Sequence, residues 1–176
     1  MKKTAIVIVI FLIIGYPSAA QKDGYKAMYD SAMTYFSLEN YQHALPIFLR
    51  MYAARPDNAN VAYHIGASYL HMPSEKFHAI PYLEKACKKV SKTISQNVDE
   101  QNAPISAYFE LGTAYLINYD LAKSTEATTK YKTFFNVNEK KDQTSIREAD
   151  RQLTMCNVAR EMLKNPVPIK VENLKG

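Results

Sequence analysis

One nine-residue stretch occurs twice, and it constrains the fold more than any other feature of the chain. His43 to Met51 and His78 to Ala86 start 35 residues apart, and each opens with His-Ala, an aliphatic residue and proline. Apolar residues then occupy nearly the same positions in both copies. Self-similarity at a period of about 20 to 50 residues is the signature of a repeat architecture. The sequence therefore predicts a stack of similar structural units.

The units are predicted to be helical. Apolar residues recur at three- and four-residue steps, the pattern of an amphipathic helix. The expected helices cover residues 24–38, 41–54, 61–71, 77–89, 105–118, 121–137 and 145–163. Short turns join the first six in pairs, as in helical hairpins, and the seventh has the charged outer face that a terminal capping helix needs. We therefore predict an all-α fold, a superhelix of about three helical hairpins with a C-terminal capping helix.

Equivalent positions in the units carry similar residues. Counting from Tyr25, Ala59 and Ile105, position 8 is Ala32, Gly66 and Gly112, and position 11 is Tyr35, Tyr69 and Tyr115. Small residues at position 8 allow the two helices of a hairpin to approach closely, and the tyrosines fill the space toward the next helix. Pro46 and Pro81 share one register in the second helices. Because proline disrupts a helix beyond its first turn, each second helix is expected to start late or to bend there.

The N-terminus has the features of a secretory signal peptide. A basic start, Met1-Lys2-Lys3, precedes an apolar run from Ala5 to Gly15, and Ser18-Ala19-Ala20 supplies small residues. This order predicts a signal peptide over residues 1–20, cleaved between Ala20 and Gln21. The alternative is a retained anchor, but the apolar run is shorter than the roughly 20 residues of a bilayer crossing. We expect an exported protein whose domain occupies residues 21–164, in units of about 25–58, 59–92 and 105–138 and a capping helix at about 145–163.

The charge of the predicted mature chain is mild. Two of the 22 basic residues precede position 21, so the mature balance is 20 minus 17, or +3. That value does not favour a nucleic-acid partner. Cys87 and Cys156 could form a disulfide in an exported protein. Both lie at apolar-face positions of predicted helices, where free cysteine is commonly buried, and the sequence leaves the two states open.

Two segments depart from the repeat pattern. Lys88 to Pro104 is polar and reads as a helix end followed by a long connection, with Lys85, Lys88, Lys89 and Lys92 on a solvated helix face. In the last segment, residues 165–176, Val167, Ile169 and Val171 alternate with polar or proline residues, which predicts a strand. One strand finds no partner in a helical chain, so this tail is expected to be disordered or to begin a further domain.

The repeat units resemble the tetratricopeptide repeat, whose 34-residue consensus has these residue types at positions 8 and 11 and in the second helix. The resemblance covers about residues 25–137 and is weakest in the second helix of the third unit, where Ser124 and Thr128 replace larger apolar residues. The consensus tryptophan of position 4 is replaced by Met28, Ala62 and Tyr108.

A second resemblance concerns the C-terminus. The run from Cys156 to Leu174 is similar to a junction in envelope proteins of Bacteroidetes-type bacteria, where a tetratricopeptide domain precedes a β-propeller and an OmpA-like peptidoglycan-binding domain. Some of those proteins belong to the periplasmic part of type IX secretion machinery. The resemblance implies a periplasmic, outer-membrane-associated protein, and it makes the tail the possible start of a missing domain.

No pattern indicates catalysis or a cofactor. His43 and His78 are equivalent repeat positions, and His64 and His71 lie seven residues apart without an acidic or thiol partner nearby in sequence, so no metal site is expected. No phosphate-binding loop and no local Ser/His/Asp or Cys/His set is present. We expect a protein that is not an enzyme and needs no cofactor.

The resemblance instead points to the concave groove, which first-helix positions 2, 5, 9 and 12 line in tetratricopeptide stacks. Its predicted binding residues here are apolar or aromatic: Tyr29, Met33, Phe36, Tyr63, Leu70, Phe109 and Leu116. Such anchors suit a peptide or an amphipathic helix. Tyr29, Met33, Ser106 and Glu110 replace the lysine, asparagine and basic residues that capture a terminal carboxylate in some family members. We expect a protein or peptide partner of the cell envelope. One alternative is a structural spacer or anchor module of a peptidoglycan-associated envelope protein, with no groove ligand, whose aromatic residues pack against the capping helix or a neighbouring domain; the other is an unrecognised hydrolase.

Overall fold

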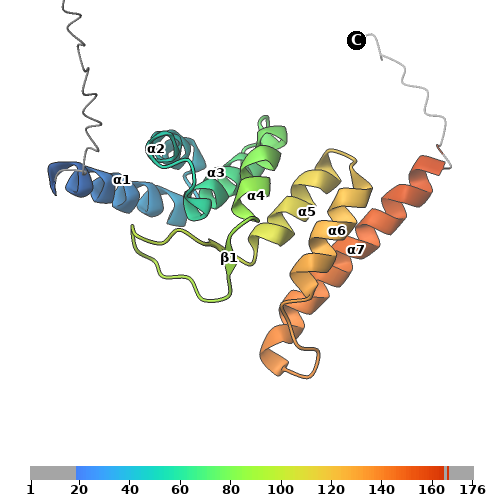
Figure 1. Cartoon of the computed structure of the whole chain (residues 1–176). Coiled ribbons are helices and arrows are strands. Elements are labelled where there is room, and N and C mark those ends of the chain that lie inside the picture. Colours follow the sequence, from blue (N-terminus) through green and yellow to red (C-terminus); the bar gives the residue numbers. More distant parts are fainter. Residues whose placement is uncertain (1–18, 165, 167–176) are drawn as a thin grey trace, which may run out of the picture.

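The computed structural model describes residues 19–164 and 166, which form seven α-helices in a row (Figure 1). The helices are α1 (Ala19–Ser37), α2 (Tyr41–Ala54), α3 (Ala59–His71), α4 (Ala79–Ala86), α5 (Ala107–Ile117), α6 (Leu121–Lys132) and α7 (Gln143–Lys164). Two 3₁₀ turns, η1 (Lys76–His78) and η2 (Lys140–Asp142), precede α4 and α7. α1 and α7 lie at opposite ends of the row. The predicted all-α helical-hairpin fold is confirmed.

The hairpins are α1–α2, α3–α4 and α5–α6, and the first and third share one turn geometry. Glu39 and Tyr119, equivalent in the repeat, have φ of 57° and 60°. In each turn, the amide of the following residue donates a hydrogen bond to a carbonyl group of the preceding helix. Asn40 N–H donates to Tyr35 O at 2.9 Å, and Asp120 N–H donates to Tyr115 O at 3.0 Å. This bond is the one that closes a helix C-terminus through a left-handed residue. The repeat is therefore present in the backbone as well as in the side chains.

Small residues lie where the two helices of a hairpin cross. A methyl group added at Gly66 on α3 would stand 2.5 Å from Leu83 Cγ on α4. One added at Gly112 on α5 would collide with Thr128 of α6 and stand 2.9 Å from Gln152 Nε2 of α7. The interpretation of position 8 as a close-approach position is thus confirmed.

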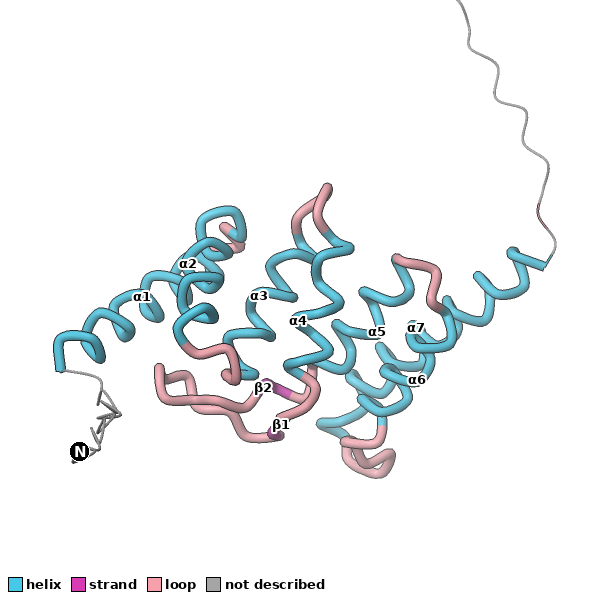
Figure 2. Tube along the Cα trace, turned by 45° about the horizontal axis from the view of Figure 1, so that its top comes forward, coloured by secondary structure: helices cyan, strands magenta, loops and turns pink. Residues whose placement is uncertain are grey.

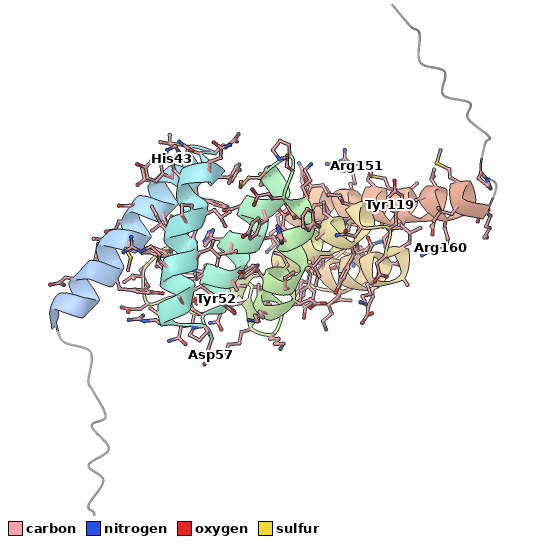
Figure 3. The ribbon with its side chains drawn as sticks, turned by 90° about the horizontal axis from the view of Figure 1, so that it is seen from above. His43, Tyr52, Asp57, Tyr119, Arg151 and Arg160 are labelled. Carbon is pink, nitrogen blue, oxygen red and sulfur yellow. The ribbon has the colours of Figure 1, made fainter. Side chains whose placement is uncertain are left out.

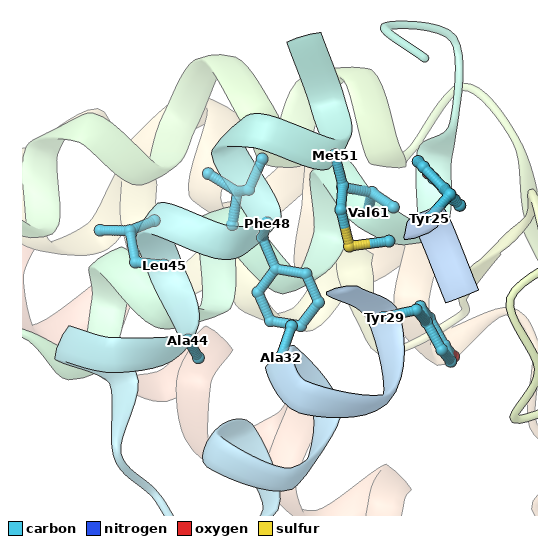
Figure 4. Close-up of a cluster of buried hydrophobic side chains, with 9 residues drawn as sticks. Tyr25, Tyr29, Ala32, Ala44, Leu45, Phe48, Met51 and Val61 are labelled. Atoms are coloured by element: carbon cyan, nitrogen blue, oxygen red, sulfur yellow. The ribbon is translucent and has the colours of Figure 1, made fainter. Parts of the chain in front are cut away.

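The largest hydrophobic cluster joins the first hairpin to α3. Phe48 and Met51 of α2 and Ile65 of α3 are fully enclosed, and they pack against Tyr25 and Tyr29 of α1 (Figure 4). A second cluster lies between the second and third hairpins. It consists of Leu70, Ala79, Leu83, Leu111, Ala114, Tyr115 and Ala127. Half-buried Tyr69 packs against both clusters, so hydrophobic packing links one hairpin to the next, as stacked repeats require.

α7 closes the row against α6. Arg160 of α7, labelled in Figure 3, donates from Nη2 to Leu121 O at 3.2 Å and to Thr125 Oγ1 at 3.1 Å. Cys156 is buried beside Ser124, with 3.1 Å between Sγ and Oγ. Both cysteines are free thiols, and burial together with the nearby Glu84 charge raises the pKa of Cys87 to about 12. Ser124 and Thr128, which weakened the predicted sixth helix, are buried and hydrogen-bonded to backbone carbonyl groups.

Residues 87–106 form the connection, the segment between α4 and α5. Its ends pair as short parallel strands, β1 (Val90–Ser91) and β2 (Ala103–Pro104). The part between them runs back beneath α1 and α3 (Figure 2). Gln101 O accepts hydrogen bonds from the amides of Ala59 and Asn60 at 3.0 and 3.3 Å, and Asn58 Nδ2 donates to Glu100 O at 3.2 Å. The connection is thus attached to the start of α3.

Several predicted boundaries were wrong. α4 ends at Ala86, so Lys88, Lys89 and Lys92 lie on the connection and not on a helix face. α6 ends at Lys132, five residues before the predicted end, and α1 begins before the predicted residue 24. Pro81 is in the first turn of α4, as a late start requires, whereas Pro46 lies inside α2.

The expected strand at 167–171 lies outside the described residues, as does the expected signal peptide up to residue 18. Within the described part of the chain, no helix combines the length and the apolar character needed to cross a membrane.

Candidate functional site

A cleft lies between the first helices of two hairpins and the connection. It consists of two adjoining cavities of about 490 and 230 Å³, which share Tyr29, Met33 and Gln96 in their linings. α1 and α3 supply one wall, and Ile94, Ser95, Gln96 and Pro104 of the connection supply the other. We call this space the cleft, and the surface formed by α1, α3 and α5 the first-helix face. The sequence predicted the helical wall but not the wall formed by the connection.

The predicted groove residues divide into three groups. Met33 and Tyr63 are half-buried and line the cleft, and Tyr29 lines it while only 4% exposed. Phe36 on α1 and Phe109 and Leu116 on α5 are half-buried but do not line it. Leu70 is buried in the cluster between the second and third hairpins. We therefore leave Leu70 out of the binding surface, and regard Tyr29 as part of the core as well as of the cleft.

At the third hairpin, α7 covers part of the first-helix face. Gln152 of α7 donates from Nε2 to Thr113 Oγ1 at 3.2 Å and to Phe109 O at 3.5 Å. The Phe109 ring packs on Tyr131 of α6, with ring centroids 5.3 Å apart. Internal packing thus accounts for some aromatic residues of the third unit, while the α1 and α3 part of the face borders open cavities.

His64 is the functional candidate that the sequence did not reveal. It lines the cleft, is 7% exposed, and its ring stacks on Phe48 at 5.0 Å with the edge of Phe36 at 4.7 Å. Burial lowers the pKa of His64 to about 4, so the imidazole is neutral near pH 7. His71, weighed with it as a metal ligand, instead stacks on Tyr41 at 4.5 Å.

Two enclosed polar atoms of the cleft have no hydrogen-bond partner within the described residues. They are Asn60 Oδ1 and His64 Nδ1, which lie one turn apart on α3. An enclosed polar group without a partner costs free energy, roughly 1–3 kcal/mol. A bound molecule that supplies the missing hydrogen bonds would remove that cost. Asn60 directly precedes the predicted helix 61–71, and its four-residue spacing from His64 was the only sequence signal for this pair.

The connection holds its shape through Glu100. The Glu100 carboxylate accepts hydrogen bonds from the amides of Ser95, Gln101 and Asn102 at 3.0, 3.0 and 2.8 Å, and from Ser95 Oγ at 2.9 Å. The bonds from the Ser95 and Asn102 amides contribute most to lowering the pKa of Glu100 to about 2. Hydrogen bonds to one ionised carboxylate therefore fix the turn that forms this wall of the cleft.

A carboxylate also lies on the first-helix face beyond the cleft. Burial raises the pKa of Glu110 on α5. Burial is likewise the largest cause of the raised pKa of Tyr41, Tyr63 and Tyr131, and the Glu110 charge adds to the rise in all three. Glu110 is half-buried, and none of the ion pairs among the described residues involves it.

Other cavities have a different character. One of about 540 Å³ lies over α5 and α6 and is bordered by the charged residues Lys123, Glu126 and Lys130. A further cavity beside Lys85, Lys88 and Lys89 adjoins the start of α3, but the Ala59 and Asn60 amides there already donate to Gln101 O. Among the described residues, no three His, Cys, Asp or Glu side chains are grouped as a metal site.

The fold and the cleft define a class: an all-α stack of helical hairpins with a cleft of aromatic, aliphatic and amide side chains on the first-helix face. No model of a known protein family matches the chain, and a search of curated proteins finds no match. The geometry of this surface is therefore the basis for the function proposed below.

Proposed function

We propose that the protein is an exported scaffold of the tetratricopeptide type, which binds a peptide segment or a helix of a partner protein in the cleft and on the adjoining first-helix face. It acts in the periplasm as part of an outer-membrane-associated assembly. The signal-like pattern of residues 1–20 and the C-terminal resemblance to envelope proteins, some of them type IX secretion components, support the location.

The observation that carries the binding role is the chemistry of the cleft. Met33 and Tyr63 supply apolar and aromatic surface, while Asn60 Oδ1 and His64 Nδ1 are enclosed and have no hydrogen-bond partner in the described part of the chain. Binding sites of this kind combine a mostly apolar lining with a few polar groups that fix the orientation of the ligand. A peptide offers both apolar side chains and backbone groups that form hydrogen bonds.

Site-specific photo-cross-linking tests the role directly. A photoreactive benzoylphenylalanine at Met33 would be compared, in cells of the source organism, with the same residue at Phe77, an exposed aromatic position that does not line the cleft. We expect one defined cross-linked protein from position 33 and none from position 77. No product at position 33, or the same products at both positions, would contradict the binding role.

The alternative is a spacer or anchor of a peptidoglycan-associated envelope protein, with no ligand in the cleft. One observation favours it: Met155, Val158 and Met162 form an apolar stripe on α7 and are 52%, 52% and 69% exposed. Such a stripe can pack against a neighbouring domain. In that case benzoylphenylalanine at Met162 would form the cross-link and position 33 would not.

A further inference from the structure

The smaller cavity of the cleft has a lining without a charged side chain. Aromatic, aliphatic, amide, hydroxyl and imidazole groups form it, and no Lys, Arg, Asp or Glu among the described residues belongs to the lining. Its volume of about 230 Å³ is several times the roughly 30 Å³ that one molecule occupies in liquid water. The cavity therefore has room for a side chain of a bound segment, and its lining offers a charged side chain no partner of opposite charge.

Two residues of this lining have hydrogen-bonding atoms that the described residues leave unused. Asn60 is 2% exposed and His64 is 7% exposed, and Asn60 Oδ1 and His64 Nδ1 are the two enclosed atoms without a partner. Residues four apart on a helix share one face, with their Cβ atoms roughly 5–6 Å apart. One small polar group between the two side chains can therefore bond to both.

The two atoms determine the chemistry of that group. Asn60 Oδ1 only accepts hydrogen bonds, so the group must carry a donor. The neutral His64 ring donates from Nδ1 in one of its two tautomers. A primary carboxamide has an N–H and its C=O on the same edge, whereas the two point in opposite directions in a trans backbone amide. A carboxamide can thus bond to Asn60 and His64 together, and a backbone amide cannot.

The larger cavity gives access to the smaller one, because Tyr29, Met33 and Gln96 line both. Side-chain rotamer changes at an interface are common on binding. The last side-chain torsions of asparagine and histidine are broadly distributed, so Asn60 and His64 can turn their enclosed atoms toward a group that fills the cavity.

We propose that the smaller cavity is a carboxamide site, which binds the side chain of one glutamine or asparagine of the segment that occupies the cleft. The carboxamide N–H donates to Asn60 Oδ1, and its oxygen accepts from His64 Nδ1. The inference deepens the proposed function and rests on it. A neighbouring apolar side chain of the same segment lies against Met33 in the larger cavity. The partner segment is therefore selected by a carboxamide residue next to an apolar one.

The test uses three peptide probes and the full chain. The first probe is acetyl-Leu-Gln-Leu-N-methylamide, and the other two carry glutamate or methionine in place of glutamine. Glutamate keeps the shape but is charged at pH 7, and methionine keeps the length without hydrogen-bonding groups of similar strength. Binding at millimolar concentrations would be followed by NMR through the ring nitrogen signals of His64, which report the tautomer and its hydrogen bonds.

We expect the glutamine probe to shift the His64 signals and to bind at least about fivefold more tightly than the other two, the value of one hydrogen bond. Equal binding of the glutamine and methionine probes would mean that the cavity is only an apolar pocket, and would overturn the inference. Tighter binding of the glutamate probe, or no response of His64 to the glutamine probe, would overturn it as well.

A variant separates the carboxamide site from the rest of the cleft. Asn60→Leu removes the acceptor at nearly constant volume, so it should abolish the preference for glutamine over methionine. Asn138→Leu, at an exposed position outside the cleft, should keep that preference. Preference retained in Asn60→Leu would refute the site, and the probe comparison on the unaltered protein decides the matter even if this variant folds poorly. A cross-link at Met33 without glutamine preference would leave the scaffold role intact and refute only the carboxamide site, and the reverse result would refute the scaffold role alone.

Discussion

The neutral, enclosed His64 predicts a specific loss of stability in acid. His64 is 7% exposed and its ring is stacked on Phe48, and among residues 19–164 its enclosed Nδ1 has no hydrogen-bond partner. A proton added to this ring would place a positive charge in an apolar environment. Burial accordingly lowers the pKa of His64 from 6.5 to about 4, which means that the folded state resists protonation while the unfolded state does not.

The sign and the pH window follow from proton binding. Above pH 6.5 the histidine is neutral in both states, and its titration has no effect. Between pH 6.5 and about 4 the unfolded state binds a proton that the folded state does not, so the free energy of unfolding falls as pH falls. A difference of 6.5 minus 4, or 2.5 pH units, at about 1.36 kcal/mol per unit gives a loss of about 3 kcal/mol.

Chemical denaturation at pH values from 7.5 to 4, followed by circular dichroism, measures this loss. The variant His64→Phe keeps an aromatic ring against Phe48 and removes the titrating group. The raised pKa of Glu110 makes the free energy of unfolding rise as pH falls. Glu110 is present in both proteins, so its contribution cancels in the difference between them. We expect the stability of the wild type to fall by about 3 kcal/mol more than that of the variant, whereas His43→Gln, at an exposed position, should follow the wild type. Parallel curves for wild type and His64→Phe would refute the reasoning.

Two further predictions concern the hairpin crossing and the connection. Gly66→Ala should lower the free energy of unfolding by about 1 kcal/mol, because the clash with buried Leu83 costs roughly 1–3 kcal/mol against a helix-propensity gain of up to about 1 kcal/mol. Gly24→Ala, where the added methyl group meets nothing within 4 Å, should be neutral or stabilising. Equal thermal midpoints for the two variants would contradict a close approach of α3 and α4 at Gly66. Glu100→Gln should speed hydrogen exchange of the Asn102 amide while leaving the helical midpoint nearly unchanged, since that carboxylate bonds only the connection. The wild type should show the same loosening as pH falls from 4.5 toward about 2, and unchanged exchange in the variant would rule out this anchoring role.

The repeat was sufficient to predict the helical part of the fold because its information is local. Apolar spacing specified each helix, and the small residue at position 8 specified where two helices cross, as Gly66 and Leu83 show. Even the equivalent turns at Glu39 and Tyr119 follow the repeat, although their left-handed geometry was not anticipated. Similar residues at similar spacing produce similar packing, so one unit predicts the next.

The connection could not be predicted in the same way because its bonds join residues far apart in sequence. Gln101 O binds the amides of Ala59 and Asn60, about forty residues earlier. The pairing of Val90 with Ala103 likewise depends on where α4 ends and α5 begins. A polar composition alone gives no register for such contacts. The cleft has the connection as one wall, so half of the candidate site was invisible in the sequence.

Position 6 of the three first helices shows how a regular stack acquires a specific surface. The residues there are Asp30, His64 and Glu110. Asp30 is exposed and paired with Lys26 at 2.5 Å, His64 is enclosed and neutral, and Glu110 is half-buried and belongs to no ion pair among the described residues. Because the repeat places all three at one register, their different states arise from their surroundings: a lysine one turn before Asp30, the Phe48 and Phe36 rings beside His64, and partial burial at Glu110. The repeat therefore supplies the position, and the surroundings decide whether the group is satisfied internally or remains free for a ligand.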